Sequence, residues 1–176
     1  TAFPQFHGLL PYVAKEVYRA DQTWLGYMVA GAAFGALLGA IVLSRYGGSV
    51  RAGRMTLVFC AGWYAMLMVF AQLQHPVGGI VVLILAGCAQ SLGQVPMVTL
   101  LLRNSDEQFR GRIMGIRMLA IYGNLPGLLL AGPLIAHFGY PITGTLYCTF
   151  GLAFTALIAV RWRAHLWRLG APANTR

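Results

Sequence analysis

Three long stretches of this chain contain no Asp, Glu, Lys or Arg. They cover residues 22–44, 55–102 and 118–160, and hydrophobic residue types make up 58% of the whole chain. A helix that crosses a hydrocarbon core about 30 Å thick needs about 20 apolar residues. The three stretches therefore predict one, two and two membrane crossings, and we expect an all-α, polytopic transmembrane bundle.

Five complete spans and the end of a sixth fit this pattern. The complete spans are expected at about residues 24–43, 55–73, 80–102, 113–137 and 142–160. Residues 1–14 are apolar but short and begin with Thr1, so we expect the outer end of a helix whose beginning is missing. Residues 24–163 should then form one five-span bundle, and residues 164–176 a cytoplasmic tail.

Arginine clusters separate the apolar stretches. Eleven of the 13 basic residues lie within residues 45–54, 103–117 and 161–176. Because the crossings between them come in pairs, all three clusters share one side, and short Arg-rich loops stay cytoplasmic in bacterial-type insertion. We therefore expect a bacterial inner-membrane protein with a cytoplasmic C-terminus. Short turns are expected on the opposite side, at residues 75–79 and 137–141, where Pro and Gly interrupt helices.

Composition also argues against several classes of function. The net charge of +9 does not predict a nucleic-acid partner, because the arginines recur at loop spacing rather than along one face. The Cys and His residues have no metal-ligand spacing, and the few carboxylates, Glu16, Asp21, Asp106 and Glu107, lie in predicted loops. We expect no enzyme activity, no cofactor and no metal site.

Glycine and proline mark positions of close helix packing or of bending. Gly31, Gly35 and Gly39 recur every four residues, which places two overlapping GxxxG motifs on one helix face. Such a face predicts a seam of close packing against another helix, and the two helices can also slide along this seam. A second group of helix-interrupting residues suggests kinks used for packing or gating: Pro96 in the third span, with Gly123, Pro126 and Gly127 in the fourth.

Amides inside the spans are the candidate ligand-binding groups. Gln90 and Gln94 are spaced i and i+4, so both project from one face of the third span. They predict either a polar cavity wall or interhelical hydrogen bonds. Asn124, beside Pro126 in the middle of the fourth span, predicts either a gating or cavity-lining role or plain close packing, and Tyr122 is a weaker candidate. Arg117 lies about one turn inside that span, where snorkelling or pairing with a nearby carboxylate favours a structural role.

Three motifs carry a resemblance to a known family. Gly39-Ala-Ile-Val-Leu-Ser44-Arg45-Tyr-Gly47, followed by Arg51 and Arg54, is similar to the Gly/Asp-Arg/Gly/Arg loop of the major facilitator superfamily. The run Asp106-Glu107-Gln-Phe-Arg110-Gly111-Arg112-Ile-Met-Gly115 resembles the loop before helix eleven of its bacterial efflux-type members. Gly123-Asn-Leu-Pro-Gly127, with Ala131-Gly132-Pro133 and Phe138-Gly139, resembles their helix eleven. Ser44 departs from the pattern, because the family usually has an acid there.

The resemblance implies the C-terminal half of a secondary transporter, from the end of helix seven to helix twelve. Its partners would be the lipid bilayer, the missing N-terminal half and a small-molecule substrate. It further implies alternating access and proton-coupled efflux of amphipathic compounds such as drugs or siderophore-like metabolites. Gln90, Gln94, Asn124 and Tyr122 would then line the substrate cavity. Because the spans contain no carboxylate, any coupling acid would lie in the missing N-terminal portion. The alternative is a non-transporting membrane scaffold, a sensor or a truncated remnant.

Overall fold

The computed structural model describes residues 9–18, 21–46, 52–103, 107–123 and 125–161. Within these ranges all regular structure is helical. The described part starts with the short helix α2 and the π-helical turn η1, continues through the long helices α3, α4 and α5, and closes with η3 and the helices α6, α7 and α8. The elements are α2 (Leu10–Tyr12), η1 (Val13–Val17), α3 (Gln22–Tyr46), α4 (Ala52–Gln72), α5 (Pro76–Arg103), η3 (Glu107–Phe109), α6 (Arg110–Tyr122), α7 (Leu125–Phe138) and α8 (Tyr140–Arg161).

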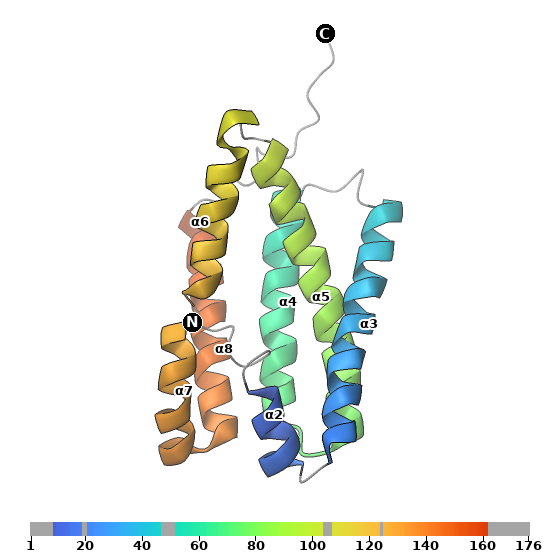
Figure 1. Cartoon of the computed structure of the whole chain (residues 1–176), viewed down its shortest axis with the longest axis vertical. Coiled ribbons are helices and arrows are strands. Elements are labelled where there is room, and N and C mark those ends of the chain that lie inside the picture. The colour runs from blue at the N-terminus through green and yellow to red at the C-terminus, as the bar shows by residue number, and fades with distance from the viewer. Residues whose placement is uncertain (1–8, 19–20, 47–51, 104–106, 124, 162–176) are drawn as a thin grey trace.

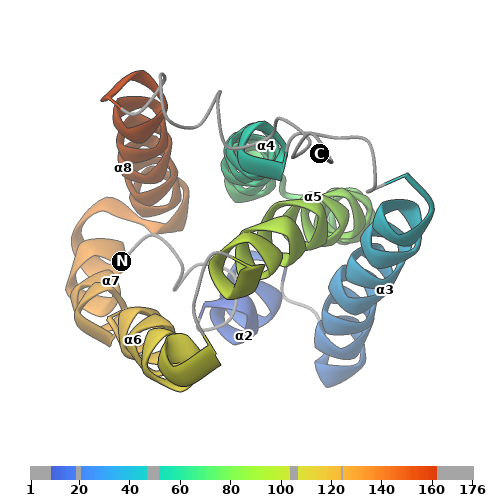
Figure 2. The same ribbon diagram turned by 90° about the horizontal axis from the view of Figure 1, so that it is seen from above.

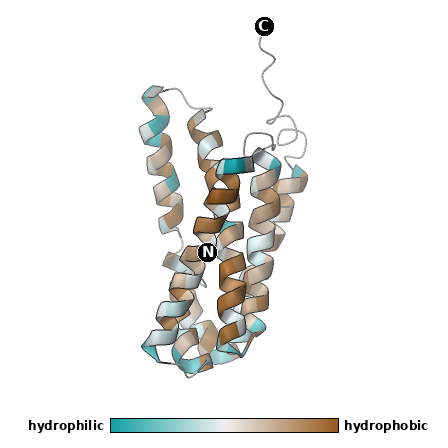
Figure 3. Cartoon of the chain, turned by 90° about the vertical axis from the view of Figure 1, so that its right-hand side faces the viewer, coloured by the Kyte–Doolittle hydropathy of each residue, from teal (hydrophilic) through white to brown (hydrophobic). Residues whose placement is uncertain are grey.

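Five segments are long and apolar enough to cross a membrane, which confirms the predicted helical bundle. Four of them are α3, α4, α5 and α8, and the fifth runs from Arg110 to Phe138 through α6 and α7. Each predicted span falls within one of these segments, to within a residue at its ends. The fourth span is two helices rather than one, because α6 ends at Tyr122 and α7 begins at Leu125. Figure 3 shows apolar residues along the helices and polar ones near both ends of the bundle.

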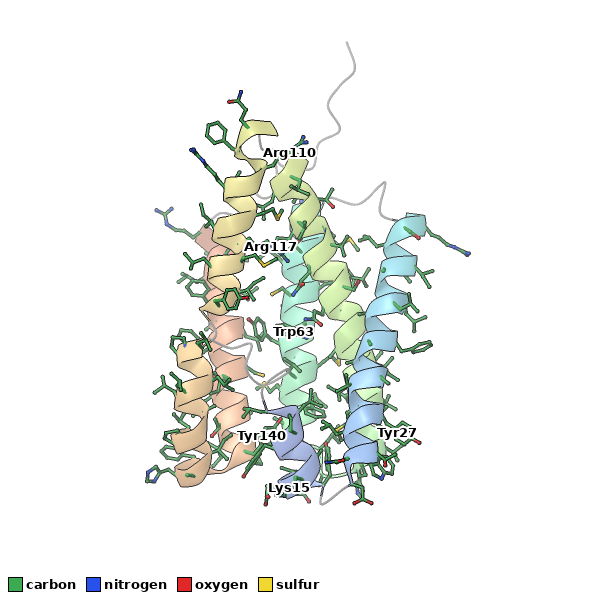
Figure 4. All side chains as sticks on the ribbon, in the orientation of Figure 1. Lys15, Tyr27, Trp63, Arg110, Arg117 and Tyr140 are labelled. Carbon is green, nitrogen blue, oxygen red and sulfur yellow. The ribbon has the colours of Figure 1, made fainter. Side chains whose placement is uncertain are left out.

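The five membrane-spanning segments run alternately up and down, with α6 and α7 running in the same direction and α5 at the centre (Figure 1). Both α3 and α4 pack along α5, and α4 also packs against α8. Seen from above, α5 lies between α3 and α4, and α8, α7 and α6 follow around the other side (Figure 2). Arg110 and Lys15 mark opposite ends of the bundle (Figure 4). The arginine-bearing helix ends thus share one end, as the pairing of crossings requires.

One predicted turn is shorter than expected. Residues 75–79 were expected to reverse the chain, but α5 already begins at Pro76, and the Gly79 N–H donates to the His75 carbonyl at 3.0 Å. Proline suits the first helical position because its missing N–H has no intrahelical acceptor there. At the second turn α7 ends at Phe138 and Gly139 has φ 78°, a left-handed conformation that favours glycine.

The glycines of α3 lie directly against α5. A Cβ atom built on Gly35 would collide with the backbone carbonyl oxygen of Ile84, and one on Gly39 would lie 2.7 Å from that of Cys88. The contact is reciprocal, because a Cβ on Gly87 of α5 would collide with the Ala32 carbonyl. The two backbones therefore touch without intervening side chains, the arrangement by which small residues promote packing in membranes.

The N-terminal turn packs into the base of the bundle. Leu10, Val13 and Ala14 are buried, and the Tyr18 ring meets the Phe70 ring edge-on, with centroids 6.3 Å apart. The Tyr18 hydroxyl is buried near Gly79 and has no hydrogen-bond partner among the described residues. Burial raises the pKa of this phenol, so it stays neutral.

Candidate functional site

A pocket of about 410 Å³ lies between α2, α3 and α5. The residues that surround it come from one position on α2, four on α3 and four on α5: Leu10, Val29, Ala32, Ala33, Ala36, Gln90, Ser91, Gln94 and Val95. Both long helices contribute from their central parts, so the pocket lies well inside the predicted hydrocarbon layer.

Alanines on α3 leave the space that the pocket occupies. Val29, Ala32, Ala33 and Ala36 are spaced i, i+3, i+4 and i+7, which puts them on one face of the helix. The neighbouring face carries the glycines that hold α3 against α5, with Ala32 itself opposite Gly87. The seam therefore fixes the distance between the two pocket walls.

The α5 wall supplies the hydrogen-bonding groups. Gln90, Ser91 and Gln94 place two amides and a hydroxyl on the same pocket, and none of the three side chains bonds to another described residue. Gln90 and Ser91 are half-buried and Gln94 is exposed, so all three are accessible to a ligand that enters the pocket. Each amide can both donate and accept a hydrogen bond.

The pocket is electrically neutral. None of its nine described lining residues ionises, and the remaining walls are aliphatic. Its chemistry is that of an apolar recess with one polar edge, the usual composition of a site for a small organic molecule. The described residues also hold no group of three His, Cys, Asp or Glu that would bind a metal ion.

The structure brings together two of the four residues predicted to contact a substrate. Gln90 and Gln94 line the pocket, whereas Tyr122 is 67% exposed at the end of α6 and does not border it. Asn124 lies outside the described residues. Ser91 and the alanines of α3 were not predicted. The i, i+3, i+4, i+7 spacing of small residues on α3 was the sequence signal that could have found them.

The residues predicted for packing or gating occupy distinct surroundings. Pro96 is buried within the continuous helix α5, whereas Gly123 caps the end of α6 and donates its N–H to the carbonyls of Leu119 and Ala120 at 3.1 and 3.2 Å. Pro126 is the second residue of α7. Gly127 is buried, and its carbonyl accepts a 2.7 Å hydrogen bond from the Tyr147 hydroxyl of α8.

The arginine-rich loop motifs sit at one end of the bundle. Arg45 is in the last turn of α3, Arg54 is half-buried near the start of α4, and Arg110, Gly111 and Arg112 begin α6. The Arg112 guanidinium lies 5.8 Å from the centroid of the Phe109 ring, a cation–π distance. Gly47 of the first motif is outside the described residues.

Curated proteins similar to this chain are exporters. The enterobactin exporter EntS of Citrobacter koseri is 28% identical over 149 residues, which cover 84% of this chain and 36% of the exporter. The EntS proteins of Salmonella typhi and Salmonella typhimurium are each 27% identical over 151 residues, which cover 85% of this chain and 36% of each exporter. The chain thus spans about a third of the length of these relatives. No solved structure matches it.

The family comparison covers most of the chain. The model of the Major Facilitator Superfamily matches residues 1–129, a range that contains the α3–α5 seam, the whole pocket and both arginine-rich motifs. It agrees with the membrane-spanning helices and with the exporters to which the chain is similar. The chain belongs to the Major Facilitator Superfamily.

Proposed function

We propose that the chain is the C-terminal half of a secondary transporter that exports small amphipathic molecules by alternating access. Membership of the family supports transport rather than enzyme activity, and the exporters among the relatives support the outward direction. The single observation that carries the proposal is the pocket in the middle of α3 and α5. It combines an apolar interior with amide and hydroxyl groups that have no other described partner.

The substrate in this proposal is a small molecule with an apolar body and several hydrogen-bonding groups, siderophore-like metabolites included. The apolar body would contact Val29, Ala33 and Val95, and the polar groups would bond to Gln90, Ser91 and Gln94. The end of the bundle that carries Arg110 would face the cytoplasm of a bacterial inner membrane. Rocking of this half against an N-terminal half would expose the pocket to each side in turn.

Removing one amide should weaken transport without unfolding the protein. Gln94→Leu keeps the approximate size of the side chain and removes its hydrogen-bonding groups, so we expect about three- to tenfold less efflux of a substrate dye by the complete transporter. Efflux from preloaded cells measures this, with the amount of protein in the membrane determined in parallel. Gln72→Leu is the matched control, because Gln72 is exposed at the end of α4, away from the pocket. Equal efflux by the Gln94 variant and the unsubstituted protein would remove Gln94 from the site.

We also propose that the export is coupled to proton entry. The apolar spans α3, α4, α5, α7 and α8 contain no carboxylate, so the coupling group would lie elsewhere in the transporter. In proteoliposomes that contain the complete transporter, an imposed pH gradient should drive dye accumulation, and a protonophore should abolish it. A scaffold or sensor would move no dye under either condition. Equal flux with and without the gradient would contradict proton coupling and leave transport itself in place.

A further inference from the structure

Arg117 is a cation about one turn inside the predicted fourth span. It follows Arg110, the first residue of α6, by seven residues, which corresponds to about 10 Å of helix rise. The surrounding residues of the helix, Met114, Ile116 and Met118, are apolar. A charge at this depth is costly in a membrane, and such residues usually face the bundle interior and mark a substrate or ion pathway.

The side chain faces the bundle rather than the lipid. None of the residues of α6 is buried, but three are only partly exposed, namely Ile113, Met114 and Arg117. Their i, i+1, i+4 spacing defines one face of the helix. The far side carries Leu119 and Tyr122, which are 73% and 67% exposed. Figure 4 shows Arg117 projecting from α6 toward the α4 and α5 side, as Arg110 does two turns away.

The described part of the protein offers Arg117 no counter-charge. It makes no ion pair or hydrogen bond with any described side chain, and Glu16 and Asp21 lie at the opposite end of the bundle, near Lys15. Glu107 starts η3, the turn that precedes α6, ten residues before Arg117. Among the described side chains none therefore neutralises the Arg117 guanidinium, while Asp106, which the sequence offered as one pairing partner, lies outside the described residues.

We infer that Arg117 recognises an anionic group on the transported molecule, which makes the substrate class amphipathic organic anions. The inference rests on the proposed transport function. A guanidinium binds carboxylate or phosphate oxygens through two parallel N–H donors. Arg117, on α6, is not one of the pocket-lining residues of α2, α3 and α5, so in this inference it binds the anionic group as a second point of contact, while the neutral pocket lined by Gln90 and Gln94 accepts the uncharged, hydrogen-bonding part. Anionic lipid headgroups carry the same oxygen chemistry and are the competing source of the anion.

The test uses two fluorescent compounds that differ in one charge, dansylglycine and its neutral amide. The complete transporter is reconstituted in phosphatidylcholine vesicles, and binding is measured by dansyl fluorescence. Arg117→Gln should weaken dansylglycine binding about tenfold or more and leave binding of the amide unchanged. Arg117→Lys should recover part of the loss. Arg112→Gln is the matched control, because Arg112 is exposed on another face of the same helix.

Each other outcome has a definite meaning. If Arg117→Gln weakens the binding of both compounds equally, Arg117 acts by maintaining the structure. If the variant binds dansylglycine as tightly as the unsubstituted protein does, Arg117 does not recognise the anion. Phosphatidylglycerol tests the lipid alternative. If this lipid displaces dansylglycine from the unsubstituted protein, and if it stabilises the unsubstituted protein but not the Arg117→Gln variant, the anion is a lipid headgroup and the substrate assignment is wrong. Flux is measured separately. Binding without movement of either compound would contradict the proposed transport, whereas movement of the amide alone, without dansylglycine binding, would contradict only the role of Arg117.

Discussion

Gly35→Ala is expected to destabilise the protein by about 2–3 kcal/mol, the upper part of the range for overpacked interiors. The added methyl group would collide with the carbonyl oxygen, carbonyl carbon and Cα of Ile84. These are backbone atoms, so no rotamer change relieves the collision, and α3 has to move away from α5. The separation would also loosen Gly39 and Gly87, whose contacts depend on the same close approach.

The control for this substitution lies on the same helix. Gly26 has nothing within 4 Å of the position that a Cβ would occupy, and alanine is the better helix former by about 1 kcal/mol, so Gly26→Ala should be neutral or slightly stabilising. Thermal unfolding in detergent can be followed with a thiol-reactive dye, because the thiol of Cys148 is buried in the folded protein and becomes accessible on unfolding. Gly35→Ala should therefore lower the midpoint temperature of unfolding, whereas Gly26→Ala should leave it unchanged or raise it slightly. Equal midpoints would mean that α3 and α5 are not in backbone contact.

The helical bundle was predictable because the bilayer imposes a minimum apolar length. The charge-free stretches determined the spans, and the arginines between them marked the common end. The break after Tyr122 was visible only as a group of Gly and Pro residues, because proline in a membrane helix can either bend it or interrupt it. In α5 the helix continues through Pro96, whereas near Pro126 it stops. Residue type alone does not distinguish these two outcomes.

The pocket was only partly predictable for a different reason. Helices such as α3 and α5 are apolar on all sides, so their periodicity does not reveal which face points inward. Gln90 and Gln94 stood out because amides are rare in such segments, but Ser91 and Ala33 look like ordinary small residues until the two helices are placed together. The direction of Arg117 likewise depends on how α6 is rotated, which its sequence does not determine.

Filling the pocket should abolish most transport. Ala33 lines the pocket yet is exposed, so a larger side chain at this position meets open space rather than a packed neighbour. Ala33→Trp would put an indole ring beside Gln90 and Gln94 and would occupy much of the 410 Å³ now available. We expect efflux of a substrate dye by the complete transporter to fall more than about tenfold, with melting temperature and membrane level unchanged. This effect exceeds that of Gln94→Leu, because the ring excludes the whole ligand and the leucine removes one hydrogen-bonding group.

Ala153→Trp on α8 is the matched control. Ala153 is exposed, and its neighbours Phe150 and Phe154 are 61% and 57% exposed, so this face already carries aromatic rings and does not border the pocket. We expect Ala153→Trp to leave transport unaffected.

A binding assay separates a blocked pocket from a general disturbance of α3. The purified Ala33→Trp protein should fail to bind the dye while keeping its melting temperature. Retained binding with lost flux would place the substrate elsewhere and give α3 a role in movement. If Ala33→Trp retained both dye binding and flux, α3 and α5 would have no part in substrate binding.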